Sequence, residues 1–189
     1  MIISISGMPG SGKTTNGRYL AQELGYKFYG MGILRREMAR QRGWTIKELN
    51  QVGETQEFTD KEVDDFQAKL GQTSDNFVVD GWTSFYFIPH SFKIFLQCDL
   101  RTGAARIWKE LQKDGITRNE GRELHTVEDV EKDLAIRIES SRRRYLKYYG
   151  IDYMKLDQYD LVLDTSHLTP EEVNQRLLEE VNKNVVAAK

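Results

Sequence analysis

Apolar residues gather in five short runs along the chain, each followed by a longer segment with helical spacing. The runs cover residues 2–5, 26–29, 76–80, 92–96 and 160–163. Residues 76–80 and 92–96 lack the alternation of a half-exposed strand, as expected for strands covered by helices on both faces. Strands that alternate with helices in this way predict an α/β fold with a parallel sheet of five strands.

The segments between these runs contain helix start and stop signals. We expect a helix over residues 14–24 closed by Gly25, and another over 33–39. Two short helices should follow with capping boxes at Thr45 and Thr59, the second ending at Gly71. A long helix capped by Thr126 should extend from 127 to about 149, and a last helix should begin at Thr169. Residues 113–125 are polar with few apolar anchors, which favours a mobile flap.

Length and composition limit the class of protein. A chain of 189 residues suits one domain. With 27 basic and 29 acidic residues, the net charge of -2 gives no uniform positive field to attract a nucleic acid polymer. The single cysteine, Cys98, excludes an internal disulfide and fits a reducing cytosol. Without an apolar run near the ~18 residues of a membrane span, we expect a cytoplasmic protein. We also expect a monomer that acts on small molecules.

The clearest motif follows the first strand. Gly7, Gly12, Lys13 and Thr14 meet the phosphate-binding pattern G-x-x-x-x-G-K-S/T, with a strand before it and a helix after it. Glycines let the backbone curl around phosphates, and the helix adds its positive end. Lys13 supplies a full charge toward the β- and γ-phosphates, and the Thr14 hydroxyl a ligand for Mg²⁺. The expected ATP contacts are Gly7, Pro9, Gly10, Ser11, Gly12, Lys13, Thr14 and Thr15.

A second polar site is expected where the third apolar run ends. Asp80 stands where phosphate-binding-loop enzymes place an acidic residue toward the metal or the acceptor, and Gly81 follows it. The alternative is an ordinary aspartate at a strand end. An Asn-Lys-x-Asp segment for guanine recognition is absent from the sequence, which argues against a GTPase.

Further motifs follow in a fixed order, and together they resemble a known family. They are Leu34-Arg35-x-x-x-Ala39, Asp60-x-x-x-Asp64, Val79-Asp80-Gly81, Arg137-x6-Arg144-Tyr145, Tyr149-Gly-Ile-Asp152 and the segment from Tyr159 to Ser166. With the phosphate-binding loop, this order resembles the nucleoside-monophosphate kinases, and within them the cytidylate kinases of archaeal type. The resemblance extends from Ile2 to about Val181.

This resemblance implies transfer of the γ-phosphate of ATP, with Mg²⁺, to CMP or dCMP. It also implies one three-layer P-loop kinase domain over 1–189 with strand order 2-3-1-4-5, an acceptor-binding insertion at about 30–72 and a lid at about 106–140. Arg35 would grip the acceptor phosphate, and Arg106 would lie at the nucleotide-facing edge of the lid. Asp60 and Asp64 would belong to the insertion, although a solvated helical start explains them about as well.

Two arginines of the long helix are candidates for catalysis beside Lys13. Phosphoryl transfer needs charge compensation rather than a protein nucleophile. Arg137 and Arg144 are seven residues apart, which offsets them by only ~20° around the helix and roughly 10 Å along it, so both can point to one cleft. The alternative is a solvated basic face, which we favour for Arg142 and Arg143.

Two positions depart from the family pattern. Trp82 follows Gly81 where an arginine is expected, and Ile138 stands where an acidic residue is expected. Another acceptor, such as AMP, another nucleoside monophosphate or a non-nucleotide alcohol, therefore stays open, and a non-catalytic nucleotide-binding module is a weaker alternative. For the aromatic cluster of Trp82, Phe85, Tyr86 and Phe87, core packing is favoured over a wall for a base.

Overall fold

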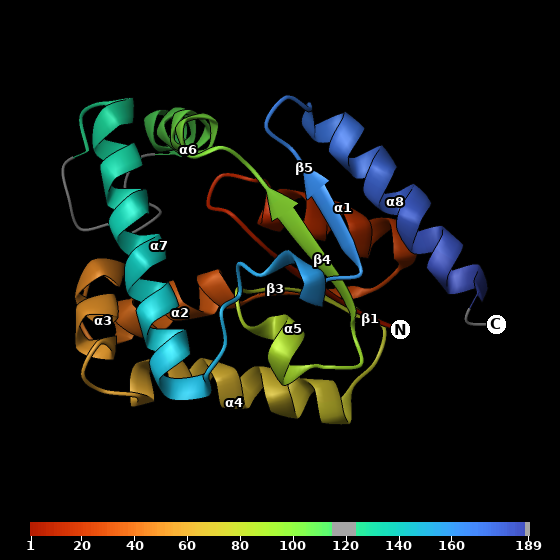
Figure 1. Cartoon of the computed structure of the whole chain (residues 1–189), viewed down its shortest axis with the longest axis horizontal. Helices are drawn as coiled ribbons and strands as arrows, with labels where there is room; N and C mark the ends of the chain where they lie inside the picture. Colours follow the sequence, from red (N-terminus) through yellow and green to blue (C-terminus); the bar gives the residue numbers. More distant parts are fainter. Residues whose placement is uncertain (115–123, 188–189) are drawn as a thin grey trace.

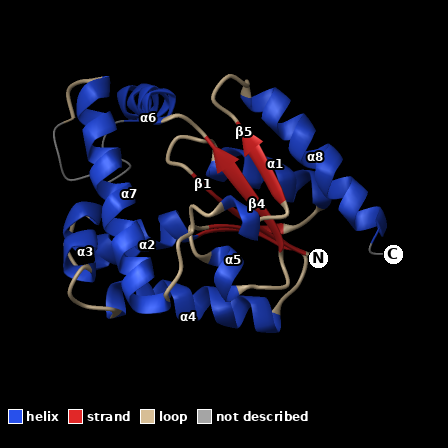
Figure 2. Ribbon diagram, viewed as in Figure 1, coloured by secondary structure: helices blue, strands red, loops and turns tan. Residues whose placement is uncertain are grey.

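The structure, a computed structural model, describes residues 1–114 and 124–187 and is built on a parallel sheet (Figures 1 and 2). Its five strands are β1 (Ile2–Gly7), β2 (Lys27–Gly30), β3 (Phe77–Asp80), β4 (Phe92–Gln97) and β5 (Leu161–Asp164). They are ordered β2-β3-β1-β4-β5, and every neighbouring pair is parallel. The predicted class and strand order are confirmed.

Helices cover both faces of the sheet (Figure 1). On one face, α1 (Lys13–Leu24) and α8 (Pro170–Ala187) pack on a cluster that includes Ile3, Ile5 and Ile94. On the other face, Phe95 packs with α5 (Ser84–Phe87) and the end of α7 (Val127–Tyr149). Along a buried strand, alternate side chains therefore point into the cores on the two faces of the sheet. This explains why every position of β1 and β3 is buried and is either apolar or carries a small polar side chain.

The chain between β2 and β3 forms a separate group of helices. These are α2 (Met31–Gln41), α3 (Ile46–Gly53) and α4 (Phe58–Thr73), and they share a buried cluster with the start of β1 and with β3. The long α7 lies against α3 along its second half and against α6 (Leu100–Asp114) near its start (Figure 1). The fold thereby brings α2–α4, α6 and α7 together around the carboxyl ends of the strands.

Several helix signals are confirmed and two are wrong. Helix α7 begins after Thr126 with a complete capping box, as predicted, and Gly25 closes α1 in a left-handed conformation. The Thr59 capping box does not form, because α4 already begins at Phe58 and Thr59 is buried within it. Nor does Gly71 end α4, which continues to Thr73. A Cβ at Gly71 would lie 2.9 Å from Cγ2 of Ile88, so this glycine allows close packing instead.

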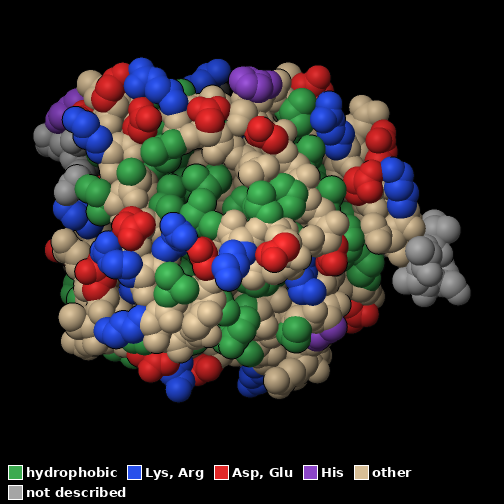
Figure 3. Space-filling model, in the orientation of Figure 1, with side chains coloured by type: hydrophobic (Ala, Val, Ile, Leu, Met, Phe, Trp, Pro, Cys, Tyr) green, Lys and Arg blue, Asp and Glu red, His purple; other side chains and the backbone are tan. Residues whose placement is uncertain are grey.

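The surface of the protein carries charged side chains of both signs. On the face shown in Figure 3, acidic and basic side chains are interspersed, in keeping with a net charge of -2. Within residues 1–114 and 124–187, no helix is long and apolar enough to cross a membrane. The expected flap, with Gly115, Arg118, Gly121 and Arg122, lies largely outside the described residues.

Candidate functional site

A cavity of about 770 Å³ opens at the carboxyl ends of β1 and β3. Its wall comes from the β1–α1 loop, from α2 and α4, and from α6 and α7. With the exception of Gly7, every predicted site residue lines it: Pro9, Gly10, Ser11, Gly12, Lys13, Thr14, Thr15, Arg35, Asp60, Asp64, Asp80, Gly81, Arg106, Arg137 and Arg144. The fold therefore brings together side chains from distant parts of the sequence.

The phosphate-binding loop depends on its glycines. Gly7, Gly10 and Gly12 have φ of +142°, +74° and +86°, which other residues rarely adopt. A Cβ on Gly7 would lie 2.2 Å from the Leu96 carbonyl oxygen, so β4 approaches the loop as closely as a glycine allows. Gly12 directly precedes the first turn of α1. The N–H groups of this turn place a partial positive charge next to the loop.

Lys13 is folded back over this loop. Its Nζ donates to the carbonyl oxygens of Gly7 at 2.9 Å and Met8 at 2.7 Å. The Ser11 hydroxyl is buried, and within the described parts of the chain it has no hydrogen-bond partner. An anion in the loop would meet the Lys13 ammonium and the Ser11 hydroxyl.

Thr14 and Asp80 form the part of the cavity suited to a divalent cation. The Thr14 hydroxyl donates to Oδ2 of Asp80, whose pKa is raised because burial penalises its charged form. A hydroxyl and one carboxylate are hard oxygen ligands, which suit Mg²⁺ because it keeps most of its ligands as water and phosphate oxygens. Among the described residues no cluster of three His, Cys, Asp or Glu side chains forms a metal site. The pair therefore fits Mg²⁺ delivered with a phosphate ligand.

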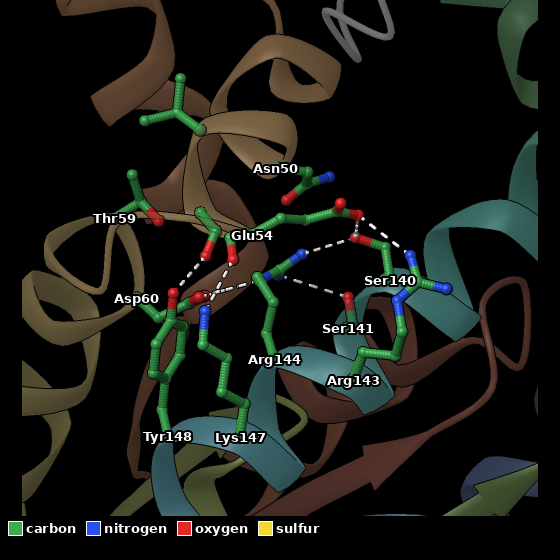
Figure 4. Close-up of polar contacts among 12 residues, drawn as sticks. Asn50, Glu54, Thr59, Asp60, Ser140, Ser141, Arg143, Arg144, Lys147 and Tyr148 are labelled. Carbon is green, nitrogen blue, oxygen red and sulfur yellow. Dashed lines mark hydrogen bonds and ion pairs between the residues drawn. The ribbon is translucent and has the colours of Figure 1, made fainter.

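At the other end of the cavity, Asp60 lies between Arg35 and Arg144, and Figure 4 shows its contact with Arg144. Oδ1 of Asp60 accepts from Arg35 of α2, and Oδ2 accepts from Nε of Arg144 of α7 at 2.8 Å. Asp60 is 1% exposed and Arg144 is 2% exposed. The solvated alternatives for these two residues are therefore wrong. Arg35 also donates to the Asn50 side chain at 3.0 Å, which ties α3 to the same cluster.

The neighbouring arginines of α7 behave differently. Arg142 pairs with Asp152, and Arg143 pairs with Glu54 at the end of α3. Glu54 also accepts from the Ser140 hydroxyl at 2.7 Å, so α3 and α7 are joined beside the buried cluster (Figure 4). These contacts are at the surface, as favoured from the sequence for Arg142 and Arg143.

Asp64 lies one helical turn after Asp60 and is also buried. Its Oδ1 accepts from Gln67 at 2.6 Å and from the Thr83 hydroxyl at 2.9 Å, and its Oδ2 accepts from the Tyr149 hydroxyl at 2.7 Å. Burial raises the pKa of Asp64 to about 6, although these hydrogen bonds act in the opposite direction. The solvated alternative is wrong for Asp64 as well.

Arg137 enters the same cavity as Arg144, as their spacing predicted. Its guanidinium carbon lies 5.4 Å from the ring centroid of Trp82. The Trp82 indole N–H donates to the Gly7 carbonyl at 2.9 Å, and the ring stacks on Tyr153 at 5.2 Å. Phe85 is buried in the core beneath, so the aromatic cluster is in part core packing.

Arg106 connects two loops around the phosphate site. It donates to the carbonyl oxygens of Gly10 at 3.3 Å, Thr165 at 2.7 Å and Leu168 at 3.2 Å. Helix α6 approaches closely at Gly103, where a Cβ would lie 2.5 Å from the Pro9 carbonyl oxygen. Sequence reasoning missed Gly103, although an isolated glycine inside a helical pattern is a signal for such packing.

Gly81 lies at the end of β3. Its N–H donates to the Ile5 carbonyl oxygen at 3.1 Å, and a Cβ on it would lie 2.5 Å from the Ser84 hydroxyl. Asn50 and Ser141 line the cavity but were missed, because neither belongs to a motif. Only the packing of α3 and α7 beside the buried Asp60 reveals them.

Comparisons with known proteins show the family and the fold of the chain. The chain is 33% identical over 178 residues to a cytidylate kinase of Methanobrevibacter smithii, covering 94% of this chain and 96% of the relative. It is 36% identical to a cytidylate kinase of Pyrobaculum aerophilum, covering 89% and 86% of the two chains. A shikimate kinase structure from Bacteroides thetaiotaomicron, 18% identical with a TM-score of 0.63 over 96% and 98% of the chains, shares the fold. The model of the cytidylate kinase-like family matches residues 2–167, and the chain belongs to that family.

Proposed function

We propose that the protein transfers the γ-phosphate of ATP to CMP or dCMP, giving the nucleoside diphosphate and ADP. The observation that supports this most strongly is that one cavity has a phosphate-binding loop at one end and the buried Arg35–Asp60–Arg144 cluster at the other. A donor and an acceptor bound in one cavity react without diffusing apart. Relatives named cytidylate kinase support CMP as the acceptor.

On the donor side, the loop from Gly7 to Thr15 receives the phosphates of ATP. Lys13 compensates their charge, and Arg106 holds the β5–α8 loop against Gly10. Thr14 and Asp80 would hold Mg²⁺, which when bound neutralises charge on the phosphate oxygens. The chain itself supplies orientation and fixed positive charge to a transition state whose charge is spread over the equatorial oxygens.

On the acceptor side, Arg35 offers a planar fork suited to a bidentate phosphate contact. Arg137 and Arg144 lie in the same cavity, and Asp60 holds Arg35 and Arg144 in fixed orientations before any ligand arrives. Asp64 and Gly81 belong to the wall around the acceptor.

The proposed organisation follows from these positions. Residues about 30–72 form the acceptor-binding insertion, and residues about 106–140 belong to a lid that keeps water from the γ-phosphate. Excluding water matters because hydrolysis of ATP competes with transfer. We propose a cytoplasmic monomer that acts on small-molecule nucleotides, in keeping with one buried, unpaired cysteine.

The test is an ADP-release assay with ATP and Mg²⁺ against CMP, dCMP, UMP and AMP. We expect acceptor-dependent ADP release that is fastest with CMP or dCMP, and a loss of at least 100-fold, roughly, in Lys13→Ala, because one preorganised charge on the transition state contributes a factor of that order. Release that depends on none of the four acceptors would contradict the proposal. A clear preference for AMP would instead favour the alternative acceptor that Trp82 leaves open.

A further inference from the structure

Trp82 is an aromatic residue in the wall of the cavity with polar and stacking contacts on several sides. Its ring contacts the Arg137 guanidinium and stacks on Tyr153 with an interplanar angle of 11°. Its N–H is bonded to the Gly7 carbonyl of the phosphate-binding loop. The indole is thus fixed on its far side by Tyr153 and at its edge by the loop that receives the donor.

We propose that Trp82 is a positioning residue that places the Arg137 guanidinium between the two ends of the cavity. This inference rests on the proposed kinase function. Tryptophan is the best aromatic partner for a cation, and the flat guanidinium stacks well on such a face. Because the indole is hydrogen-bonded to Gly7, the position of Arg137 is set relative to the donor loop itself.

This role explains how the chain can have an aromatic residue directly after Gly81. A long arginine side chain has many rotamers, and holding it in one of them costs conformational entropy. A rigid face beside it reduces the number of rotamers that compete with the productive one. Trp82 therefore acts through an existing cation, Arg137, instead of supplying another.

A wall for the acceptor base is the competing role for Trp82. A base stacked on this ring would have to share it with Arg137 or displace the guanidinium. The two roles differ in kinetics, because a wall contributes to acceptor binding whereas a positioned cation contributes to the transition state.

The kinetic test compares Trp82→Leu, which removes the aromatic face, with Trp82→Phe, which keeps a face but loses the N–H. We expect kcat of Trp82→Leu to fall roughly tenfold, equivalent to about 1.4 kcal/mol of transition-state stabilisation, with KM for CMP changed less than threefold. Trp82→Phe should lose less than Trp82→Leu. The matched control is Tyr86→Leu, because Tyr86 is a 43% exposed aromatic residue that does not line the cavity. A higher KM with unchanged kcat would overturn the proposal in favour of the wall.

A double-mutant cycle tests whether Trp82 acts through Arg137. A residue that acts only by placing Arg137 has no further effect once that arginine is gone. We therefore expect the double variant Trp82→Leu/Arg137→Leu to be no slower than Arg137→Leu alone. Two independent, multiplicative losses would overturn the proposal.

A spectroscopic readout separates this inference from the proposed function. The chain has three tryptophans, so replacing Trp44 and Trp108 by phenylalanine leaves Trp82 as the sole indole fluorophore. We expect Arg137→Leu to change the emission of Trp82 in the absence of nucleotide, and Arg137→Lys to change it less. Unchanged emission would overturn the contact even in an active kinase. Changed emission without turnover on any acceptor would retain the contact while the proposed function fails.

Discussion

Removing the Asp60 carboxylate is expected to destabilise the whole domain, because two arginines share it. Asp60 of α4 is 1% exposed and accepts from both Arg35 and Arg144. In Asp60→Ala, the Arg144 guanidinium stays buried and keeps its hydrogen bonds to the buried hydroxyls of Ser140 and Ser141, but it loses its carboxylate partner. The variant therefore leaves positive charge in a region from which water is excluded.

The magnitude follows from the burial of both partners. Breaking a buried ion pair by removing one partner costs about 3–5 kcal/mol. In a domain of this size, each kcal/mol lowers Tm by about 2–4 °C, so the loss amounts to roughly 6–20 °C. Asp60→Asn keeps the shape and some hydrogen bonds, and we expect it to lose about half as much as Asp60→Ala.

Urea unfolding of the three proteins measures this loss, with Asp65→Ala as the matched control because Asp65 is an exposed residue of the same helix. The control should stay within about 0.5 kcal/mol of the parent. Inorganic phosphate should restore part of the stability of Asp60→Ala and little of the parent's, because it can replace the missing anion. A loss below about 1 kcal/mol in Asp60→Ala, equal to that of the control, would refute the claim that Asp60 balances both arginines.

The remaining predictions concern pH, packing and the α3–α7 contact. Burial raises the pKa of Asp64 to about 6, whereas the value in the unfolded chain is near 3.9. As pH rises, the unfolded chain therefore loses this proton first, and the contribution of Asp64 to the free energy of unfolding falls by roughly 3 kcal/mol between about pH 4 and pH 6. Asp64→Asn should therefore gain stability relative to the parent at pH 7.5 but not at pH 4; urea unfolding at both values checks this, and a pH-independent difference would contradict it. Gly103→Ala, which places a Cβ 2.5 Å from the Pro9 carbonyl oxygen, should cost about 1–3 kcal/mol and weaken ATP binding, as measured by thermal unfolding and calorimetry; unchanged ATP affinity would argue against this packing. Glu54→Gln weakens a surface pair with Arg143 and should cost less than about 1 kcal/mol in urea unfolding, so a loss above about 2 kcal/mol would show that the α3–α7 contact matters more than its exposure suggests.

Features with a local physical cause could be predicted from the sequence. Gly12, Lys13 and Thr14 are consecutive, at the point where the loop after β1 enters α1, so their role is readable without tertiary contacts. Arg137 and Arg144 are on one unbroken helix, and helical geometry alone places both on one face. Their joint presence in the cavity followed from spacing.

The cluster around Asp60 depended on contacts that spacing does not encode. Arg35, Asp60 and Arg144 come from three helices that are far apart in the sequence, and their ion pairs exist only because α4 packs between α2 and α7. Thr59 shows the same limit for a local signal. The Thr59 side chain is buried. A Cβ on Gly53 would contact both Thr59 and Arg144, so these two side chains lie beside each other. Tertiary packing therefore decides the position of Thr59 in the helix, and capping propensity does not.

In the proposed reaction, the terminal phosphate of ATP passes to CMP. The most direct measurement follows ATP labelled at the γ-phosphate, with Mg²⁺ and with or without CMP, in the parent protein and in Lys13→Ala. We expect label in the β-phosphate of CDP, in amounts equal to the ADP formed, with little label in inorganic phosphate and little transfer by Lys13→Ala. Label found only in inorganic phosphate, or remaining in ATP when CMP is present, would contradict it.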